Sequence, residues 1–195
     1  DNGATASTAY CLRAVKSDGT VLNTYTVVPQ ITTASAAATI SCSTNISSTS
    51  FSALTTASVF TASPNASTTM SCSGTSSGCA LSVKDAGNGS NPGLATTTPA
   101  YLIPSNTATL AAGAEGYGIQ ATTTAAGSGG ALGINATYNK IGNDVGGLSL
   151  SAVTLASSTV DVTNREVVAT HKAAVSTLTL SGSYSDTITY SCTVN

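Results

Sequence analysis

The single histidine is the first residue to consider for chemistry, because a Ser-His-Asp triad needs an imidazole to carry its proton. His171 stands in the run 167–172, Val-Val-Ala-Thr-His-Lys, whose β-branched residues are typical of a strand. No Gly-x-Ser-x-Gly nucleophile turn accompanies this histidine. We therefore expect a strand histidine, exposed or hydrogen-bonded, and not a catalytic one.

Acidic residues are the second candidates, since a glycoside hydrolase works with two carboxyl groups on either side of the scissile bond. Tryptophan is absent and phenylalanine occurs only twice, so aromatic platforms for a sugar are scarce. We expect the acids to be solvated at turns and strand ends, and the protein not to be an enzyme. The acids are Asp1, Asp18, Asp85, Glu115, Asp144, Asp161, Glu166 and Asp186.

Some Gly-rich runs could be calcium-binding or phosphate-binding loops, or they could be simple turns. The run Asp85–Asn91 offers oxygen ligands for calcium but lacks the carboxylate density of a calcium loop, so its Gly and Asn residues favour a plain turn. The Gly-rich runs 113–118 and 127–130 do not follow a strand-then-helix pattern, which excludes phosphate-binding loops. We expect no metal and no cofactor.

The five cysteines predict disulfides, because they lack the close paired spacing of zinc or iron–sulfur sites. Strand alternation turns Cys42 and Cys192 toward the core, so a bridge between them is the first choice. Cys72 and Cys79 flank a turn-rich connection and predict a hairpin bridge. Cys11 is then left for an intersubunit bond or a free thiol. In the rival pairing, Cys11 bonds to Cys42 and leaves Cys192 over.

Composition disfavours some classes of binding partner and indicates where the protein is located. Only 7% of the 195 residues are charged and the net charge is -2, which disfavours nucleic acid and anionic membranes. No apolar run approaches the ~18–20 residues that span a bilayer, so we expect no membrane insertion. The sequence starts at Asp1 without a basic leader, as a processed secretory protein would. A secreted, extracellular or cell-surface protein is expected.

Short runs rich in Val and Thr recur between Gly, Pro, Asn and Ser turns, and no helical period intervenes. This pattern predicts an all-β protein, an antiparallel β-sandwich of the Ig-like or jelly-roll type with Greek-key connections. The expected strands are 21–31, 36–42, 57–61, 68–72, 80–84, 108–111, 117–124, 132–138, 148–155, 160–163, 167–175 and 184–194.

The first 31 residues can be interpreted in two ways. Their long alternating apolar run ends at Pro29 and could form the first strand of the sandwich, or an arm that fills a groove in a neighbouring copy. We divide the chain into an N-terminal arm, 1–31, and a β-sandwich domain, 32–195. The candidate donor-strand residues are Val21, Tyr25, Val27 and Ile31.

Four Asn-x-Ser/Thr sequons are candidate glycosylation sites, which in a secreted protein would lie on the surface. In a chain this rich in Ser, Thr and Asn, some sequons arise by chance, and unmodified surface asparagines are the simpler interpretation. The sequon residues are Asn45, Asn65, Asn88 and Asn135.

Two stretches resemble a known group of proteins. The run 181–194, Ser-Gly-Ser-Tyr-Ser-Asp-Thr-Ile-Thr-Tyr-Ser-Cys-Thr-Val, resembles the Gly-x-Tyr-x-Asp-Thr-[Ile/Val]-Thr terminal strand of secreted bacterial β-sandwich proteins, including spore-coat-U-like fimbrial subunits. The run 38–43, Ala-Thr-Ile-Ser-Cys-Ser, is similar to the strand that carries their early cysteine. The resemblance implies polymerisation by donor-strand complementation, in which the N-terminal segment of one subunit completes the sheet of the next.

The expected function follows from these points. An open groove between strand edges is an aggregation hazard until a strand fills it, and head-to-tail filling gives an open filament. We expect a structural subunit of an extracellular filament or pilus, with copies of itself as partners. The alternative is a monomeric cell-surface adhesin or binding module, whose ligand would be a glycan or a host or cell-surface protein.

Overall fold

The computed structural model describes residues 9–11, 30–32 and 37–195. Every regular element in these residues is a β-strand, and all strand pairs are antiparallel. The chain divides into two compact units, Asp1–Ala37 and Ala38–Asn195, so the division falls six residues after the expected boundary at 31. In the first unit, β1 (Ala9–Cys11) pairs with β2 (Gln30–Thr32), and Tyr10 stands opposite Ile31.

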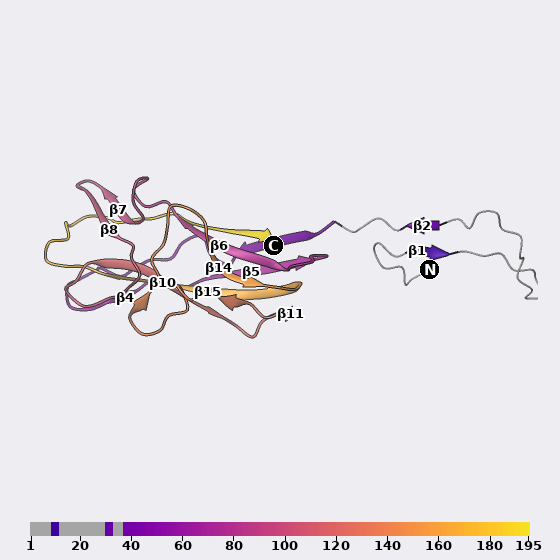
Figure 1. The fold of residues 1–195 in the computed structure, drawn as a ribbon. Helices are drawn as coiled ribbons and strands as arrows, with labels where there is room; N and C mark the ends of the chain where they lie inside the picture. The colour runs from indigo at the N-terminus through magenta and orange to yellow at the C-terminus, as the bar shows by residue number, and fades with distance from the viewer. Residues whose placement is uncertain (1–8, 12–29, 33–36) are drawn as a thin grey trace, which may run out of the picture. The chain divides into compact units, whose positions relative to one another are not determined.

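One sheet of the larger unit is built on the long strand β15 (Val162–Ala174), because its alternating Val and Ala residues suit a strand that packs on the core. On one side it pairs with β10 (Gly116–Thr123) and β11 (Ser128–Gly129). On the other side lie β5 (Ala66–Ser73) and β4 (Phe60–Thr61), and β3 (Thr39–Thr44) forms the outer edge beyond β5. Figure 1 shows β10, β15 and β5 side by side.

A second sheet has the order β12 (Gly133–Ile134), β14 (Val153–Ser158), β6 (Cys79–Asp85) and β16 (Ile188–Val194). β16 forms its outer edge. Two smaller pieces complete the unit: the hairpin of β7 (Gly93–Thr97) and β8 (Ala100–Pro104), and the short pair of β9 (Ala108–Thr109) with β13 (Asp144–Val145).

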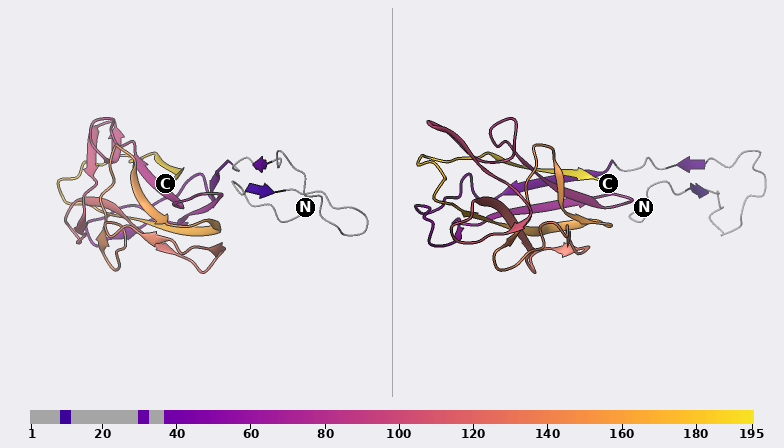
Figure 2. Two further views of the ribbon diagram at one scale, coloured as in Figure 1. Left: turned by 45° about the vertical axis from the view of Figure 1, so that its right-hand side comes forward. Right: turned by 60° about the vertical axis from the view of Figure 1, so that its left-hand side comes forward.

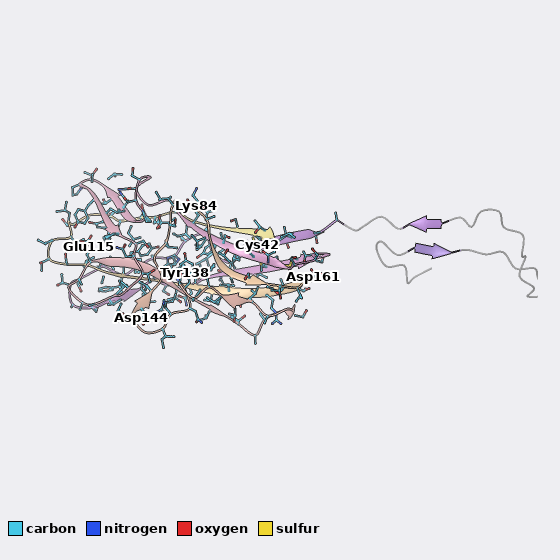
Figure 3. The ribbon with its side chains drawn as sticks, viewed as in Figure 1. Cys42, Lys84, Glu115, Tyr138, Asp144 and Asp161 are labelled. Carbon is cyan, nitrogen blue, oxygen red and sulfur yellow. A yellow bond between two sulfur atoms is a disulfide. The ribbon has the colours of Figure 1, made fainter. Side chains whose placement is uncertain are left out.

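Both larger sheets contribute to one hydrophobic core. Met70 and Ile119 come from the first sheet and Leu81 and Leu155 from the second, and each of these side chains is fully buried. Tyr138, labelled in Figure 3, is buried in the same cluster. Since these strands supply apolar residues at every second position, the alternating pattern accounts for which face of each strand is inside.

Two disulfides join the strands. Cys42 of β3 bonds to Cys192 of β16 with 6.2 Å between the Cα atoms, and Cys72 of β5 bonds to Cys79 of β6 with 6.5 Å between them. These are the pairings favoured above, and the rival Cys11–Cys42 bond does not form in this structure. One detail was wrong: Cys42 is exposed, because β3 is an edge strand, and only its partner packs against the core.

Several expected strand boundaries were wrong. The hairpin 93–104 was missed, because its Gly and Pro residues predict turns. The run 132–138 ends as a strand after Ile134, where the Asn135 side chain accepts a hydrogen bond from the backbone N–H of Thr137 and starts a turn. The run 148–155 begins its strand only at Val153, after a turn at Ser149–Ser151. The runs 160–163 and 167–175 form one strand, β15, which is continuous through an irregularity between Val162 and Arg165.

Candidate functional site: a groove beside two edge strands

The candidate site lies where the two larger sheets meet along their outer edges. Among the described strands, β3 pairs only with β5 and β16 pairs only with β6, so each keeps one edge of backbone N–H and C=O groups without a strand partner. The two edges lie side by side in Figures 1 and 2 and are joined by the Cys42–Cys192 bond, but no hydrogen-bond ladder connects them.

A groove of about 1110 Å³ opens beyond the disulfide, past the end of β3 at Thr44 and the beginning of β16 at Ile188. One wall is formed by residues 46–56 and the other by residues 176–187. The half-buried side chains of Phe51, Leu54 and Tyr184 line it, as does that of Ile188. The groove therefore combines apolar lining with two strand edges.

Both walls are held in place by specific contacts. Ser50 and Ser63 exchange backbone hydrogen bonds of 3.2 and 2.9 Å, which fix the first wall. In the second wall, the Tyr184 hydroxyl donates to the carbonyl of Leu180 at 2.6 Å. The Glu115 carboxylate, labelled in Figure 3, accepts from Thr179 at 3.2 Å and from the Tyr101 hydroxyl at 2.9 Å. The groove is thus a built feature of the fold.

The floor of the groove contains the only histidine of the chain. His171 on β15 is 4% exposed, and its Nδ1 lies 2.8 Å from the hydroxyl of Tyr117 on β10. The two rings stack with 6.0 Å between their centroids, and Phe51 meets Tyr117 edge to face. Burial lowers the pKa of His171 to about 4. The hydrogen-bonded strand histidine was expected, and its full burial could not be read from the sequence.

A pair of carboxyl groups lies at the same end of the molecule. Asp85 at the end of β6 is fully buried, and Asp186, which lines the groove, lies within hydrogen-bonding reach of it. The expectation that Asp85 is a solvated turn acid was therefore wrong. Strand alternation could have found it, because Asp85 follows the buried residues Leu81 and Val83 at the same two-residue spacing. The Tyr190 hydroxyl nearby is buried without a hydrogen-bond partner.

Asp161, Glu166 and Asp144 serve as structural acceptors. Asp161, labelled in Figure 3 near the turn from β5 to β6, accepts from the backbone N–H groups of Gly74 and Thr75 at 2.9 and 3.1 Å. Hydrogen bonds from Thr75 lower the pKa of Asp161. Those from Ser67 and Thr124 do the same for Glu166. Asp144 accepts from the Thr109 hydroxyl. These acids pin strands and turns to one another.

None of the four sequon asparagines lines the groove. Asn45, Asn65 and Asn88 are exposed, and Asn135 is half-buried in its turn. The run 85–91 is a turn in which the Asn88 side chain accepts from two backbone N–H groups. Of the donor-strand candidates, Ile31 lies in β2, and Val21, Tyr25 and Val27 lie outside the described residues. Cys11 is in β1 of the smaller unit.

One letter pattern needs comment. The residues Gly74–Gly78 spell Gly-x-Ser-x-Gly, yet they form the exposed loop that Cys72 and Cys79 close between two strands, so Ser76 has no strand-to-helix turn around it. In the part of the chain that the structure describes, no three His, Cys, Asp or Glu side chains gather as a metal site. Those residues also form no helix able to cross a membrane.

Comparison with known proteins gives no relative for this chain: no family model, no curated protein and no solved structure matches it.

Proposed function

We propose that the larger unit is a β-sandwich subunit of an extracellular filament, and that its groove receives an extended segment from a second copy of the chain. The observation that carries the proposal is the groove itself. Its volume of about 1110 Å³ exceeds the roughly 300–1,000 Å³ of small-molecule pockets, and it is continuous with two strand edges that lack partners. Such a site suits a strand better than a compact ligand.

The sequence offers an occupant for this groove. Val21, Tyr25 and Val27 are separated by even numbers of positions, so an extended segment would turn these three side chains to one face, toward an apolar lining. This segment belongs to the smaller unit, Asp1–Ala37, and the groove belongs to the larger unit, Ala38–Asn195. Each copy therefore has one donor and one acceptor, and repeated head-to-tail filling gives an open filament.

The compartment fits the same proposal. Two disulfides are typical of proteins that mature in an oxidising environment, which is consistent with a secreted protein. Alanine is the commonest residue of the core and buries little area per residue, so a strand from a neighbour would add stability that the isolated subunit lacks.

A mixing experiment tests the proposal. The groove variant Leu180→Asp/Ile188→Asp places charges on the lining, and the arm variant Val21→Asp/Val27→Asp places them on the segment. Neither variant should polymerise alone, because each lacks one half of the junction. Mixed, they should form a one-to-one dimer that does not extend, since the intact arm of the first fits the intact groove of the second. Size-exclusion chromatography with light scattering measures this.

The matched control is Ile141→Asp, which changes an 80% exposed side chain away from the groove and should polymerise like the parent chain. Circular dichroism checks that each variant is folded. If the parent chain is monomeric and negative-stain images contain no filaments, the alternative is favoured: a monomeric surface module whose groove binds a ligand. The partnerless Tyr190 hydroxyl in that groove would then point to a ligand with polar groups.

A further inference from the structure

Three carboxylate oxygens at one end of the molecule have no hydrogen-bond donor. They are both oxygens of Asp85 and Oδ2 of Asp186. Asp85 is 0% exposed, so bulk solvent does not hydrate its carboxyl group. A buried carboxylate without donors or a counter-charge is costly, because its charge has lost its hydration. At least one of the two groups must therefore be neutral or neutralised.

The backbone distinguishes the two groups. Oδ1 of Asp186 accepts from the N–H groups of Gly87 at 3.0 Å and of Thr187 at 2.7 Å, and such bonds favour the ionised carboxylate. No backbone N–H group makes a hydrogen bond of normal geometry to either oxygen of Asp85, although those of Gly93 and Gly87 lie close enough to act against the rise in its pKa. A direct contact between two carboxyl groups also requires one of them to carry a proton. Asp85 is the group that should hold it.

The surroundings supply no alternative charge. The titratable side chains that face the pair are the phenols of Tyr117 on β10 and Tyr190 on β16. His171 is hydrogen-bonded to the hydroxyl of Tyr117. Lys84 precedes Asp85 in β6 but is exposed on the opposite face of the strand. The neighbouring strands β7 and β14 contain no titratable residue. Within the described residues, no basic side chain neutralises the pair.

We propose that Asp85 keeps its proton and donates it in a hydrogen bond to ionised Asp186, and that this bond is a pH-sensitive tether between the end of β6 and the groove wall that leads into β16. When Asp85 loses the proton, two negative charges face each other and the tether becomes repulsive. The inference concerns the subunit alone and stands whatever occupies the groove.

The direction of the pH dependence follows. Burial, and secondly the negative charge of Asp186, raise the pKa of Asp85 from 3.8 to about 7. A carboxyl whose pKa is raised by folding stabilises the fold fully below its unfolded pKa, and this contribution falls as the pH rises, until the folded pKa is passed. The tether should thus hold in mildly acidic solution and break as the pH rises through about 7, while its contribution to stability declines from about pH 4 to pH 7.

The test is Asp85→Asn in the full chain, because the amide donates to Asp186 at any pH. Relative to this variant, the folding equilibrium constant of the parent chain should fall about tenfold per pH unit between pH 5 and 7 and level off above the pKa. Carboxyl ¹³C NMR should show one Asp resonance that titrates near neutral pH in the parent and is missing in the variant. Asp144→Asn, which alters an acid in a different sheet, is the matched control and should keep the parent's pH profile.

Two results would overturn the proposal. One is a ¹³C titration in which every Asp and Glu carboxyl ionises below pH 5. The other is stabilisation of the parent chain, but not of Asp85→Asn, by millimolar calcium at pH 7.5, since the pair would then hold a cation in place of a proton.

Discussion

The buried His171, which is hydrogen-bonded to Tyr117, makes the stability of the fold depend on pH. His171 has an ordinary pKa of 6.5 when exposed, but burial lowers this pKa to about 4 in the folded protein. As the pH falls from 6.5 toward 4, the histidine therefore binds a proton in the unfolded chain but not in the folded chain. Stability is lost over that window, in the direction opposite to the loss expected from Asp85.

We expect His171→Gln to be insensitive to this proton while its side-chain oxygen still accepts from the Tyr117 hydroxyl. The free energy of unfolding of the parent chain should fall relative to the variant by up to ~3 kcal/mol between pH 7 and pH 4. Urea unfolding at several pH values measures the difference, and the Asp85 effect cancels because both chains contain it. A parent-to-variant difference that does not change with pH would contradict the assignment.

Residue roles were predictable where alternation alone decides them. The two-residue period turns Cys192 inward, and the same period, extended to Asp85, would have predicted a buried acid. It could not predict that Asp186 would lie beside Asp85, because 101 positions separate them and only the pairing of β6 with β16 brings them together. A carboxyl pair of this kind is a property of strand register.

At the scale of strands, the Cys42–Cys192 bond is the covalent link between β3 and β16, and thus between the two larger sheets on the groove side. It spans 150 positions of the chain. In the chain-entropy model, a cross-link that closes a loop of this length stabilises the fold by about 5 kcal/mol. Since Cys42 is exposed, its replacement leaves no buried cavity, and the measured loss reports the cross-link.

We expect Cys42→Ala/Cys192→Ala to lower the free energy of unfolding by about 3–5 kcal/mol, because the measured stabilisation by a disulfide often falls below the chain-entropy estimate. Hydrogen exchange should accelerate in β3 and β16, while β14 stays protected. The two single variants are the control: each should lose nearly as much as the double variant, since either removes the same bond. Additive losses in denaturant titrations would mean that the two cysteines act independently.

The strand pattern explains which elements were predictable. Runs bounded by Gly and Ser turns, such as those that became β5, β6 and β16, contain enough alternation to be found. The hairpin of β7 and β8 was missed because Gly93 and Pro99 suggest a loop. Gly93 has φ of +143° and lies so close to the Ile103 carbonyl that a side chain would not fit, so here glycine is required by a strand.

For the whole molecule, the proposed filament gives Cys11 a role that can be measured. Cys42, Cys72, Cys79 and Cys192 are paired within the chain, so Cys11 is the remaining cysteine. We expect it to bond across the subunit junction. Heated in detergent without reductant, native material should give a ladder on a gel, and reductant should collapse the ladder.

Cys11→Ser is the matched variant for this prediction, because it changes one atom. It should lose the ladder and still form filaments that negative-stain microscopy detects, since the strand in the groove does not depend on the bond. A ladder that survives in Cys11→Ser would assign the cross-link to another group. Absence of both ladder and filaments in the parent would contradict the filament and not only the bond.

The all-β class and its antiparallel strands were predictable at this scale, because no segment carries a helical period. The groove was expected only as a consequence of the resemblance and could not be placed from sequence. It is formed by residues 44–56 and 175–190, two loop-rich stretches far apart in the chain, and its position depends on which strands become edges. Local composition predicts which segments form strands, but it does not predict the order of those strands in a sheet.

The pairing of β6 with β16 also determines how late in synthesis this part of the sheet can form. β6 ends at Asp85 and its partner is complete only at Val194, so the chain must grow by 109 residues before that edge is covered. At about 5–20 residues per second, this takes roughly 5–20 s. Cys72 can meet Cys79 almost at once, whereas Cys42 must wait for Cys192. Early closure of the small loop would therefore remove Cys72 and Cys79 as wrong partners for Cys42 before Cys192 is made, and would leave Cys11 as the competing thiol.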